Sequence, residues 1–244
     1  MKLKLLWFLP FVLLLFPFIG RSQQVHSFWL SGSGGINSDW ILNQNAYGNP
    51  EMAYATTFGL SGGLGANYFM SREWGMSGSL FLSKLGQNYY GEQSGAIADR
   101  KVKLTYLEMP VMIMRNIPYM NYPTWISAGP GFRFLVKGYQ DYSREDGGQP
   151  LPNETGMIKG DVTDRFKPID IAINFSINRM VELNYSRRIM FIFSIDSSIG
   201  LMDMNDVDWQ ISNTHGEYAA SHNFYIGVKA GLMFKAARFG GSRW

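Results

Sequence analysis

The stretch of sequence that decides the fold is DIAINFSINRMVELNYS, residues 170–186. In its first half, small or polar residues separate four large apolar ones, which are Ile171, Ile173, Phe175 and Ile177. The alternation is interrupted at Arg179 and Met180 and then resumes. A period of two predicts a β-strand with two unlike faces, and two such runs around a short break predict a hairpin. We therefore expect a hairpin whose turn lies at Arg179.

Alternation alone does not say which face meets water. A soluble sheet would bury the isoleucines in its core, whereas a membrane barrel would turn them outward to lipid. The rest of the chain has to decide between these two arrangements.

The first 22 residues have the layout of a secretory signal peptide. Lys2 and Lys4 precede an apolar core at residues 5–19, and the small residues Gly20 and Ser22 precede a cleavage point. The core of about 15 residues is shorter than the roughly 20 that a spanning helix needs. We expect residues 1–22 to be removed and residues 23–244 to form one exported β-barrel domain.

Removal of this segment changes the charge of the protein. The whole chain has 22 basic and 19 acidic residues, and three of the basic ones (Lys2, Lys4 and Arg21) lie in the first 22 residues. The remaining domain has a formal net charge of zero, which gives no support for a nucleic-acid or acidic-lipid partner. The chain has no cysteine, which excludes disulfides and thiol chemistry.

Eight strand-like runs follow the signal peptide, and the connections between them alternate between long and short. The runs cover residues 25–35, 55–70, 73–88, 100–116, 123–139, 167–178, 180–196 and 222–235. Long polar excursions follow the first, third, fifth and seventh runs, and short turns follow the others. In an up-and-down barrel this pattern places all long loops at one end. It predicts an all-β, eight-stranded antiparallel barrel in the Gram-negative outer membrane, with short periplasmic turns and long extracellular loops.

The barrel interior is expected to be filled by side chains, because eight strands enclose a lumen of about that width. We predict a structural polar network of charged residues facing inward: Glu108, Arg133, Asp170, Glu182 and Arg188. Lys101, Lys103 and Lys137 are further candidates for inward charges. A β-bulge is expected between Leu107 and Pro110, since proline cannot donate to the ladder. Strict counting places Arg187 in lipid, so we expect either a second bulge nearby or a position of Arg187 close to an interface.

Aromatic residues gather near the ends of the predicted strands, as in the interfacial girdles of membrane barrels. They are Tyr68, Phe69, Trp74, Tyr119, Tyr122 and Trp125 at the turn end, and Tyr89, Tyr90, Tyr139 and Tyr142 at the loop end.

Several short motifs in a fixed order resemble a known family. They are YLEMP (106–110), SAGPGFRFL (127–135), IDIAINFSI (169–177), GLMDMN (200–205) and GVKAGLMF (227–234). Over most of residues 55–235 the chain resembles the PorT-like outer-membrane β-barrel family of Bacteroidota. The resemblance implies an eight-stranded outer-membrane barrel, and the founding member belongs to the type IX secretion machinery. The ten residues that follow Phe234 depart from the usual ending of such chains at the last strand.

From this we expect a non-enzymatic monomer with a structural or interaction role in the envelope, without cofactor, metal or catalytic residues. Its partners would be membrane lipid and envelope or secretion-system proteins, bound through loops 140–166 and 197–221. One alternative is an enzyme at the barrel rim that modifies lipid A or phospholipid, using residues such as His215, His222 and Ser221. Another is a soluble periplasmic barrel that holds a small apolar ligand. The acidic stretch DMNDVD (203–208) is also a candidate for surface cation binding, although it lacks the glycine and distal glutamate of a calcium loop.

Overall fold

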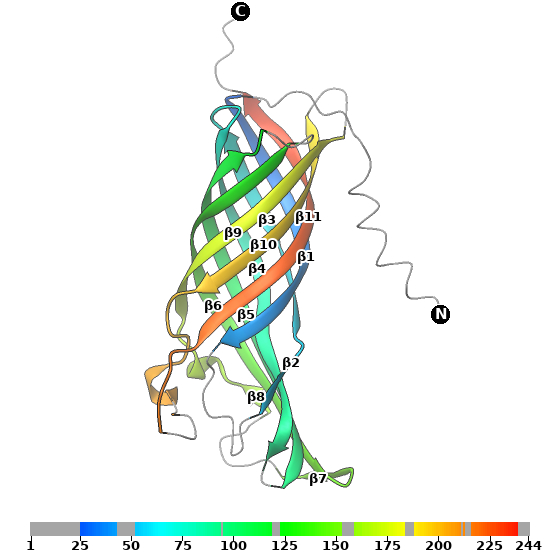
Figure 1. Cartoon of the computed structure of the whole chain (residues 1–244), viewed down its shortest axis with the longest axis vertical. Helices are drawn as coiled ribbons and strands as arrows, with labels where there is room; N and C mark the ends of the chain where they lie inside the picture. Colours follow the sequence, from blue (N-terminus) through cyan, green and yellow to red (C-terminus); the bar gives the residue numbers. More distant parts are fainter. Residues whose placement is uncertain are drawn as a thin grey trace, which may run out of the picture.

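The computed structural model shows a closed barrel of eight long antiparallel strands (Figure 1). It describes residues 25–42, 52–93, 95–118, 123–152, 159–183, 188–210, 212 and 216–238. The barrel strands are β1 (Ser27–Leu42), β3 (Phe58–Phe69), β4 (Trp74–Gln93), β5 (Ala96–Asn116), β6 (Thr124–Asp146), β9 (Ile169–Glu182), β10 (Ile189–Gly200) and β11 (His222–Arg238). The ring closes because β1 pairs with β3 on one side and with β11 on the other.

Shorter elements lie at the loop end of the barrel. They are β2 (Ala53–Ala55), β7 (Gln149–Leu151), β8 (Gly160–Asp161) and two 3-10 turns, η1 (Thr163–Arg165) and η2 (Val207–Trp209). Among the described residues, no helix has the length and apolar character needed to cross a bilayer.

Strand β9 shows which face of the alternation looks outward. Phe175 and Ile177 are 53% and 51% exposed, whereas Asn174 and Ser176 are buried inside the barrel. The other seven barrel strands also present exposed apolar side chains on their outer faces. The predicted orientation of the isoleucines, away from the interior, is therefore confirmed.

The hairpin turn predicted at Arg179 is wrong. Strand β9 continues without a break to Glu182, and the chain turns only between β9 and β10. The two residues that interrupted the pattern keep the phase of the strand: Arg179 lies on the outer phase, and Met180 points inward and is buried. The break in the apolar pattern comes from the charged, outward-facing Arg179 near the end of the strand, and not from a turn.

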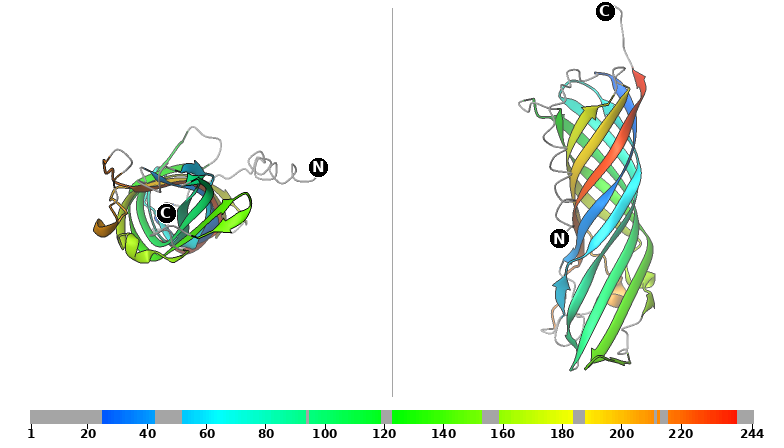
Figure 2. Two further views of the ribbon diagram at one scale, coloured as in Figure 1. Left: turned by 90° about the horizontal axis from the view of Figure 1, so that it is seen from below. Right: turned by 90° about the vertical axis from the view of Figure 1, so that its right-hand side faces the viewer.

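The long loop predicted after the third run is also wrong. β4 and β5 are extended strands joined only by residues 94–95, and Gly95 adopts φ +77°, which suits a tight turn. Together with β6 they project beyond the other strands at the loop end (Figures 1 and 2). The barrel therefore has a lopsided rim, with β4, β5 and β6 forming a sheet on one side.

The expected bulge lies on a different strand. β5 holds one phase throughout, so Val102, Leu104 and Tyr106 point inward together with Glu108. The register shift occurs instead in β6, where Thr105 pairs with Lys137 and Tyr106 with Leu135, so Val136 has no partner. Val136 and Lys137 consequently both face outward. This correction also applies to Lys101 and Lys103, which lie on the outer face of β5.

The aromatic girdle is only partly present. Trp74 is 42% exposed at the turn end, where the guanidinium of Arg115 lies 5.1 Å from its ring centroid. Phe69, Tyr89, Trp125 and Tyr142 are instead buried inside the barrel. Residues 1–22, Tyr119, Tyr122, Arg187 and His215 lie outside the described residues.

Candidate functional site

The centre of the barrel holds a row of three charged side chains from adjacent strands. β5, β6 and β9 place Glu108, Arg133 and Asp170 opposite one another in the register. Arg133 Nε lies 2.8 Å from Glu108 Oε1, and Arg133 Nη1 lies 3.2 Å from Asp170 Oδ2. Arg133 is 1% exposed, so its charge is withdrawn from water and is compensated by the two carboxylates.

Neighbouring polar groups complete the hydrogen bonding of this row. Ser83 Oγ donates to Glu108 Oε2 at 2.5 Å, and Arg133 Nη2 donates to Ser198 Oγ at 2.6 Å. The backbone N–H of Met202 donates to Asp170 Oδ1 at 3.3 Å. A buried ion pair offsets its desolvation only when such extra hydrogen bonds are made.

A second buried ion pair lies next to the first, between β10 and β11. Lys229 Nζ lies 3.5 Å from Asp196 Oδ2, which also accepts a hydrogen bond from Ser194 Oγ at 3.0 Å. The ammonium group lies 4.3 Å from the ring centroid of Phe81, a distance that allows a cation–π contact.

Glycines on the facing strands make room for these large side chains. A Cβ at Gly200 would collide with the carboxylate of Asp170. A Cβ at Gly35 would collide first with the backbone carbonyl of Val228 and would also come within 2.7 Å of Lys229 Cγ. A side chain at Gly200 would therefore displace Asp170, and one at Gly35 would push apart the strands that carry Lys229.

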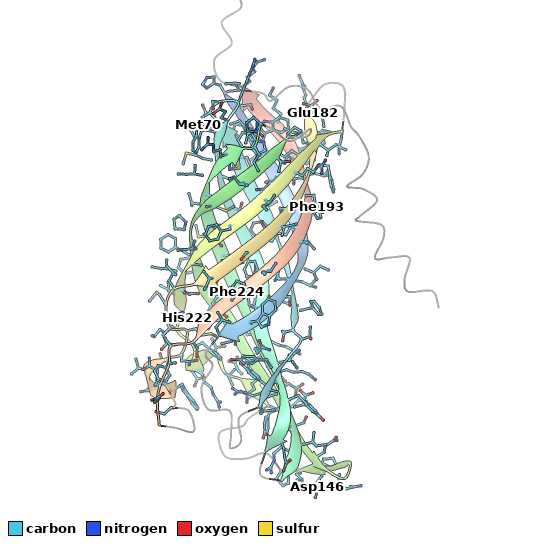
Figure 3. All side chains as sticks on the ribbon, viewed as in Figure 1. Met70, Asp146, Glu182, Phe193, His222 and Phe224 are labelled. Carbon is cyan, nitrogen blue, oxygen red and sulfur yellow. The ribbon has the colours of Figure 1, made fainter. Side chains whose placement is uncertain are left out.

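The structure brings together three of the five residues predicted for the interior network. Glu108, Arg133 and Asp170 meet in one cluster, but Glu182 and Arg188 do not join it. Glu182 is half-buried near the turn end (Figure 3), and Arg188 is exposed. The placement of these two at the centre is corrected by the longer course of β9, which carries residue 182 to the end of the barrel.

Sequence reasoning missed Lys229, Asp196 and Asp39 as interior charges. All three are buried, and in the described part of the chain neither carboxylate oxygen of Asp39 has a hydrogen-bond partner. For Asp196 and Lys229 the available signal was phase, since Lys229 lies on the same polar side of its run as Asn223. Asp39 had no such signal, because the first strand extends beyond the predicted residues 25–35 to Leu42.

Apolar side chains fill the lumen on both sides of the charged layer. At the turn end, seven of the eight barrel strands contribute to one cluster: Trp29, Phe69, Met114, Trp125, Met180 and Met233, with Met190 and Ile192 packed against it. At the loop end, a larger cluster combines strand residues with Met52, Val162, Phe166 and Met204 from the loops. Loop residues thus fold back to close the outer mouth.

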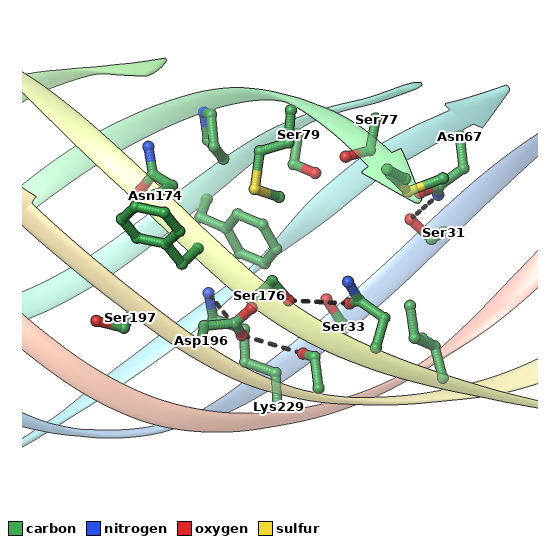
Figure 4. Close-up of a pocket in the computed structure, with 18 of the residues that line it drawn as sticks. Ser31, Ser33, Asn67, Ser77, Ser79, Asn174, Ser176, Asp196, Ser197 and Lys229 are labelled. Carbon is green, nitrogen blue, oxygen red and sulfur yellow. Dashed lines mark hydrogen bonds and ion pairs between the residues drawn. The ribbon is translucent and has the colours of Figure 1, made fainter. Parts of the chain in front are cut away.

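A small polar cavity inside the barrel is lined by the Lys229–Asp196 pair and by Met114 and Ile192 of the turn-end cluster (Figure 4). It has a volume of about 60 Å³, enough for several water molecules. Its lining includes serine and asparagine side chains such as Ser33, Asn67, Ser77 and Asn174 together with the Lys229–Asp196 pair. The cavity can hydrate the inner polar groups, and the two apolar clusters lie on either side of the charged layer.

The rim of the barrel is organised by Asp203. Its carboxylate accepts hydrogen bonds from the Tyr218 hydroxyl at 2.5 Å, from Gln210 Nε2 at 2.9 Å and from the Ser221 backbone N–H at 3.0 Å. These donors occupy the oxygens that a cation would need. Within the described ranges, no cluster of three or more metal-ligating side chains occurs.

Of the residues considered for a rim enzyme, His222 is half-buried at the start of β11. Its Nδ1 has no hydrogen-bond partner within the described part of the chain. The Ser221 hydroxyl accepts a hydrogen bond from Asn205 Nδ2 at 3.1 Å.

A closed eight-stranded ring with an apolar outer face and an interior filled by side chains defines a class, that of small membrane-spanning β-barrels. A family model described as "Outer membrane protein beta-barrel domain" matches residues 21–206. The chain belongs to this family and is an outer-membrane β-barrel protein of the Gram-negative envelope. The soluble-barrel alternative is therefore wrong.

Solved structures with a similar arrangement include other small outer-membrane proteins. OprG from Pseudomonas aeruginosa is 9% identical with a TM-score of 0.45, covering 87% of this chain and 97% of that one. Ail of Yersinia pestis is 13% identical with a TM-score of 0.35, covering 85% and 99%. AlkL, solved in DMPC bilayers, is 12% identical with a TM-score of 0.40, covering 91% and 97%.

No curated protein matches the chain at a significant level.

Proposed function

We propose that this outer-membrane barrel is a non-enzymatic, non-conducting monomer with a structural or interaction role, as an accessory to type IX secretion of the PorT-like kind. The main observation that supports the proposal is that side chains fill the lumen of the barrel. An apolar layer, a charged layer and a second apolar layer follow one another along the axis. Such an interior leaves the outer surface and the loop end as the parts available for interaction.

The projecting sheet at the loop end supports the interaction role. β4, β5 and β6 carry exposed apolar side chains beyond the level of the barrel rim, including Tyr90 and Ile97. Leu151 on β7 and Val207 on η2 add further exposed apolar surface. Apolar side chains that project into water favour contact with another protein.

Four measurements test the proposal. Purified protein in planar bilayers should show no unitary conductance. A bacterial strain that lacks the gene should keep its lipid A mass spectrum unchanged and should lose secretion of type IX cargo proteins. Light scattering of the detergent-solubilised protein should give the mass of one chain.

Each of the proposed roles can be contradicted by a separate result. Stable channel openings would contradict the non-conducting role, and a changed lipid A spectrum that His222→Ala reproduces would favour the rim enzyme. Normal cargo secretion would overturn the secretion role while leaving the structural role intact.

A further inference from the structure

The outer face of β4, β5 and β6 changes from apolar to basic at the loop end. On β4, Leu80 and Leu82 are followed on the same face by Lys84. On β6, Phe134 and Val136 are followed by Lys137. On β5, the first charged residue beyond the apolar face is Lys103. Three neighbouring strands thus each place a lysine at the edge of the apolar surface.

The strand register brings these three lysines into one patch. Thr105 pairs with Lys84 on one side and with Lys137 on the other, and Lys103 is two residues further along β5 on the same face. Lys103 is therefore the diagonal neighbour of both other lysines, at about 7–8 Å between backbone positions. Gly86, directly opposite Lys103, has no room for a side chain because a Cβ would collide with the carbonyl of Val102.

The three ammonium groups have no ion-pair partner in the part of the chain that the structure describes. Two nearby acids form ion pairs with other lysines. Asp99 Oδ2 lies 3.2 Å from Lys101 Nζ, and Asp141 Oδ1 lies 3.1 Å from Lys159 Nζ. Asp161 on β8 is also close to Lys137. Its pKa is lowered chiefly by hydrogen bonds from Thr163 and to a smaller extent by the charge of Lys137. The patch therefore carries a net positive charge.

The patch lies at the level of the lipid head groups. Trp74 and Arg115 mark the opposite edge of the same outer face. Ten residues of tilted strand separate Trp74 from Lys84, which corresponds to the apolar band of about 25 Å in membrane barrels. The lysine end of this band is the long-loop end, which faces the outside of the cell.

We propose that Lys84, Lys103 and Lys137 bind the phosphorylated head group of an outer-leaflet glycolipid of the lipid A type, whose acyl chains lie on the apolar face below them. Three cations spread over three strands match a head group that carries two phosphates. A zwitterionic phospholipid has one phosphate and its own ammonium group, so it would not compensate the positive charge of the three lysines. Lysine side chains also reach head groups easily, because their apolar stems can lie along the barrel wall.

The test measures retention of a defined lipid by the full mature chain in detergent, using native mass spectrometry. The probes are bisphosphorylated lipid A, its dephosphorylated form and phosphatidylethanolamine. A lysine near an anionic surface contributes about fivefold in affinity, so the variant K84Q/K103Q/K137Q should bind bisphosphorylated lipid A on the order of 100-fold more weakly. The dephosphorylated form and phosphatidylethanolamine should bind weakly to both proteins.

Two control variants separate a site from general electrostatics. K101Q/K159Q/K167Q removes the same charge from the same end, but from lysines that lie near Asp99, Asp141 and Asp203, and should change affinity by less than about threefold. K84R/K103R/K137R keeps the charge and should retain binding. The mobility shift of unboiled samples on gels verifies that each variant is folded. The proposal would be overturned if both glutamine variants lost the same affinity for bisphosphorylated lipid A. It would also be overturned if the native protein retained phosphatidylethanolamine as well as it retains bisphosphorylated lipid A.

Discussion

Arg133 Nε and Glu108 Oε1 lie 2.8 Å apart in the middle of the barrel, and both side chains are almost completely shielded from water. This contact ties β5 to β6, and the second arm of the guanidinium ties β6 to β9. Three consecutive strands of the ring are thus joined through one cation.

Removing the cation should leave two buried carboxylates without compensation. We expect Arg133→Met to lower the free energy of unfolding by about 3–5 kcal/mol, because breaking a buried pair leaves uncompensated charge. Urea unfolding in lipid vesicles measures this loss. The triple variant E108Q/R133M/D170N, which removes the charges together, should recover much of the stability. A triple variant no more stable than R133M would contradict the explanation.

A matched pair of aspartates tests whether pairing matters inside the barrel. Asp170 forms an ion pair with Arg133. Asp39 is buried to the same extent, but its carboxylate has no hydrogen-bond partner among the described residues. Asp170→Asn should destabilise the barrel by about 1–3 kcal/mol, whereas Asp39→Asn should be neutral or stabilising. The same unfolding assay compares them. Equal losses would mean that Asp39 has a role that its surroundings do not explain.

The apolar cluster at the turn end should contribute strongly to stability. Trp125 is 1% exposed, and its ring centroid lies 5.0 Å from that of Phe69. Trp125→Ala should cost about 3–5 kcal/mol through lost burial and a new cavity. The control Trp74→Ala, on the half-exposed interfacial residue, should cost about 1 kcal/mol. Similar losses at both positions would indicate that the cluster is loosely packed.

The rim loop between β10 and β11 should depend on Asp203. Asp203→Ala removes the acceptor for four donors, including the backbone N–H of Asn205, and should expose residues 201–221 to protease at concentrations that leave the native loop intact. Asp208→Ala, at an exposed position nearby, should behave like the native protein. Cleavage sites identified by mass spectrometry provide the measurement. An unchanged cleavage pattern in D203A would show that other contacts hold the loop.

Much of the fold could be predicted from the sequence because a period of two constrains a strand strongly. Eight strands, their antiparallel order and the outward direction of the isoleucines follow from that period and from loop lengths. Arg133 and Asp170 could be identified because each is a charged residue on the polar phase of its strand. Glu108 was placed inside correctly but through a bulge that β5 does not contain, since it shares the phase of Leu104 and Tyr106.

The errors also have physical causes. The bulge at Val136 adds one unpaired residue to β6 without any signal of its own, so Lys137 was assigned to the wrong face. Leu104 and Tyr106 are buried inside the barrel although they are apolar, so apolarity does not by itself mark the lipid face of this barrel. The interior is in fact layered, and its apolar part is built from side chains of strands and loops that meet only in the closed barrel. No local sequence pattern reveals such a layer.

The central claim is that the alternating faces of the strands separate lipid from a packed interior. The chain has no cysteine, so single cysteines can be placed at residues 171–177 of β9 and labelled with a nitroxide in lipid vesicles. Electron paramagnetic resonance then measures collision of each label with oxygen, which dissolves in the bilayer. The structure predicts high oxygen accessibility at positions 171, 173, 175 and 177 and low accessibility at 172, 174 and 176. Uniform accessibility along the strand, or the reverse alternation, would contradict the account.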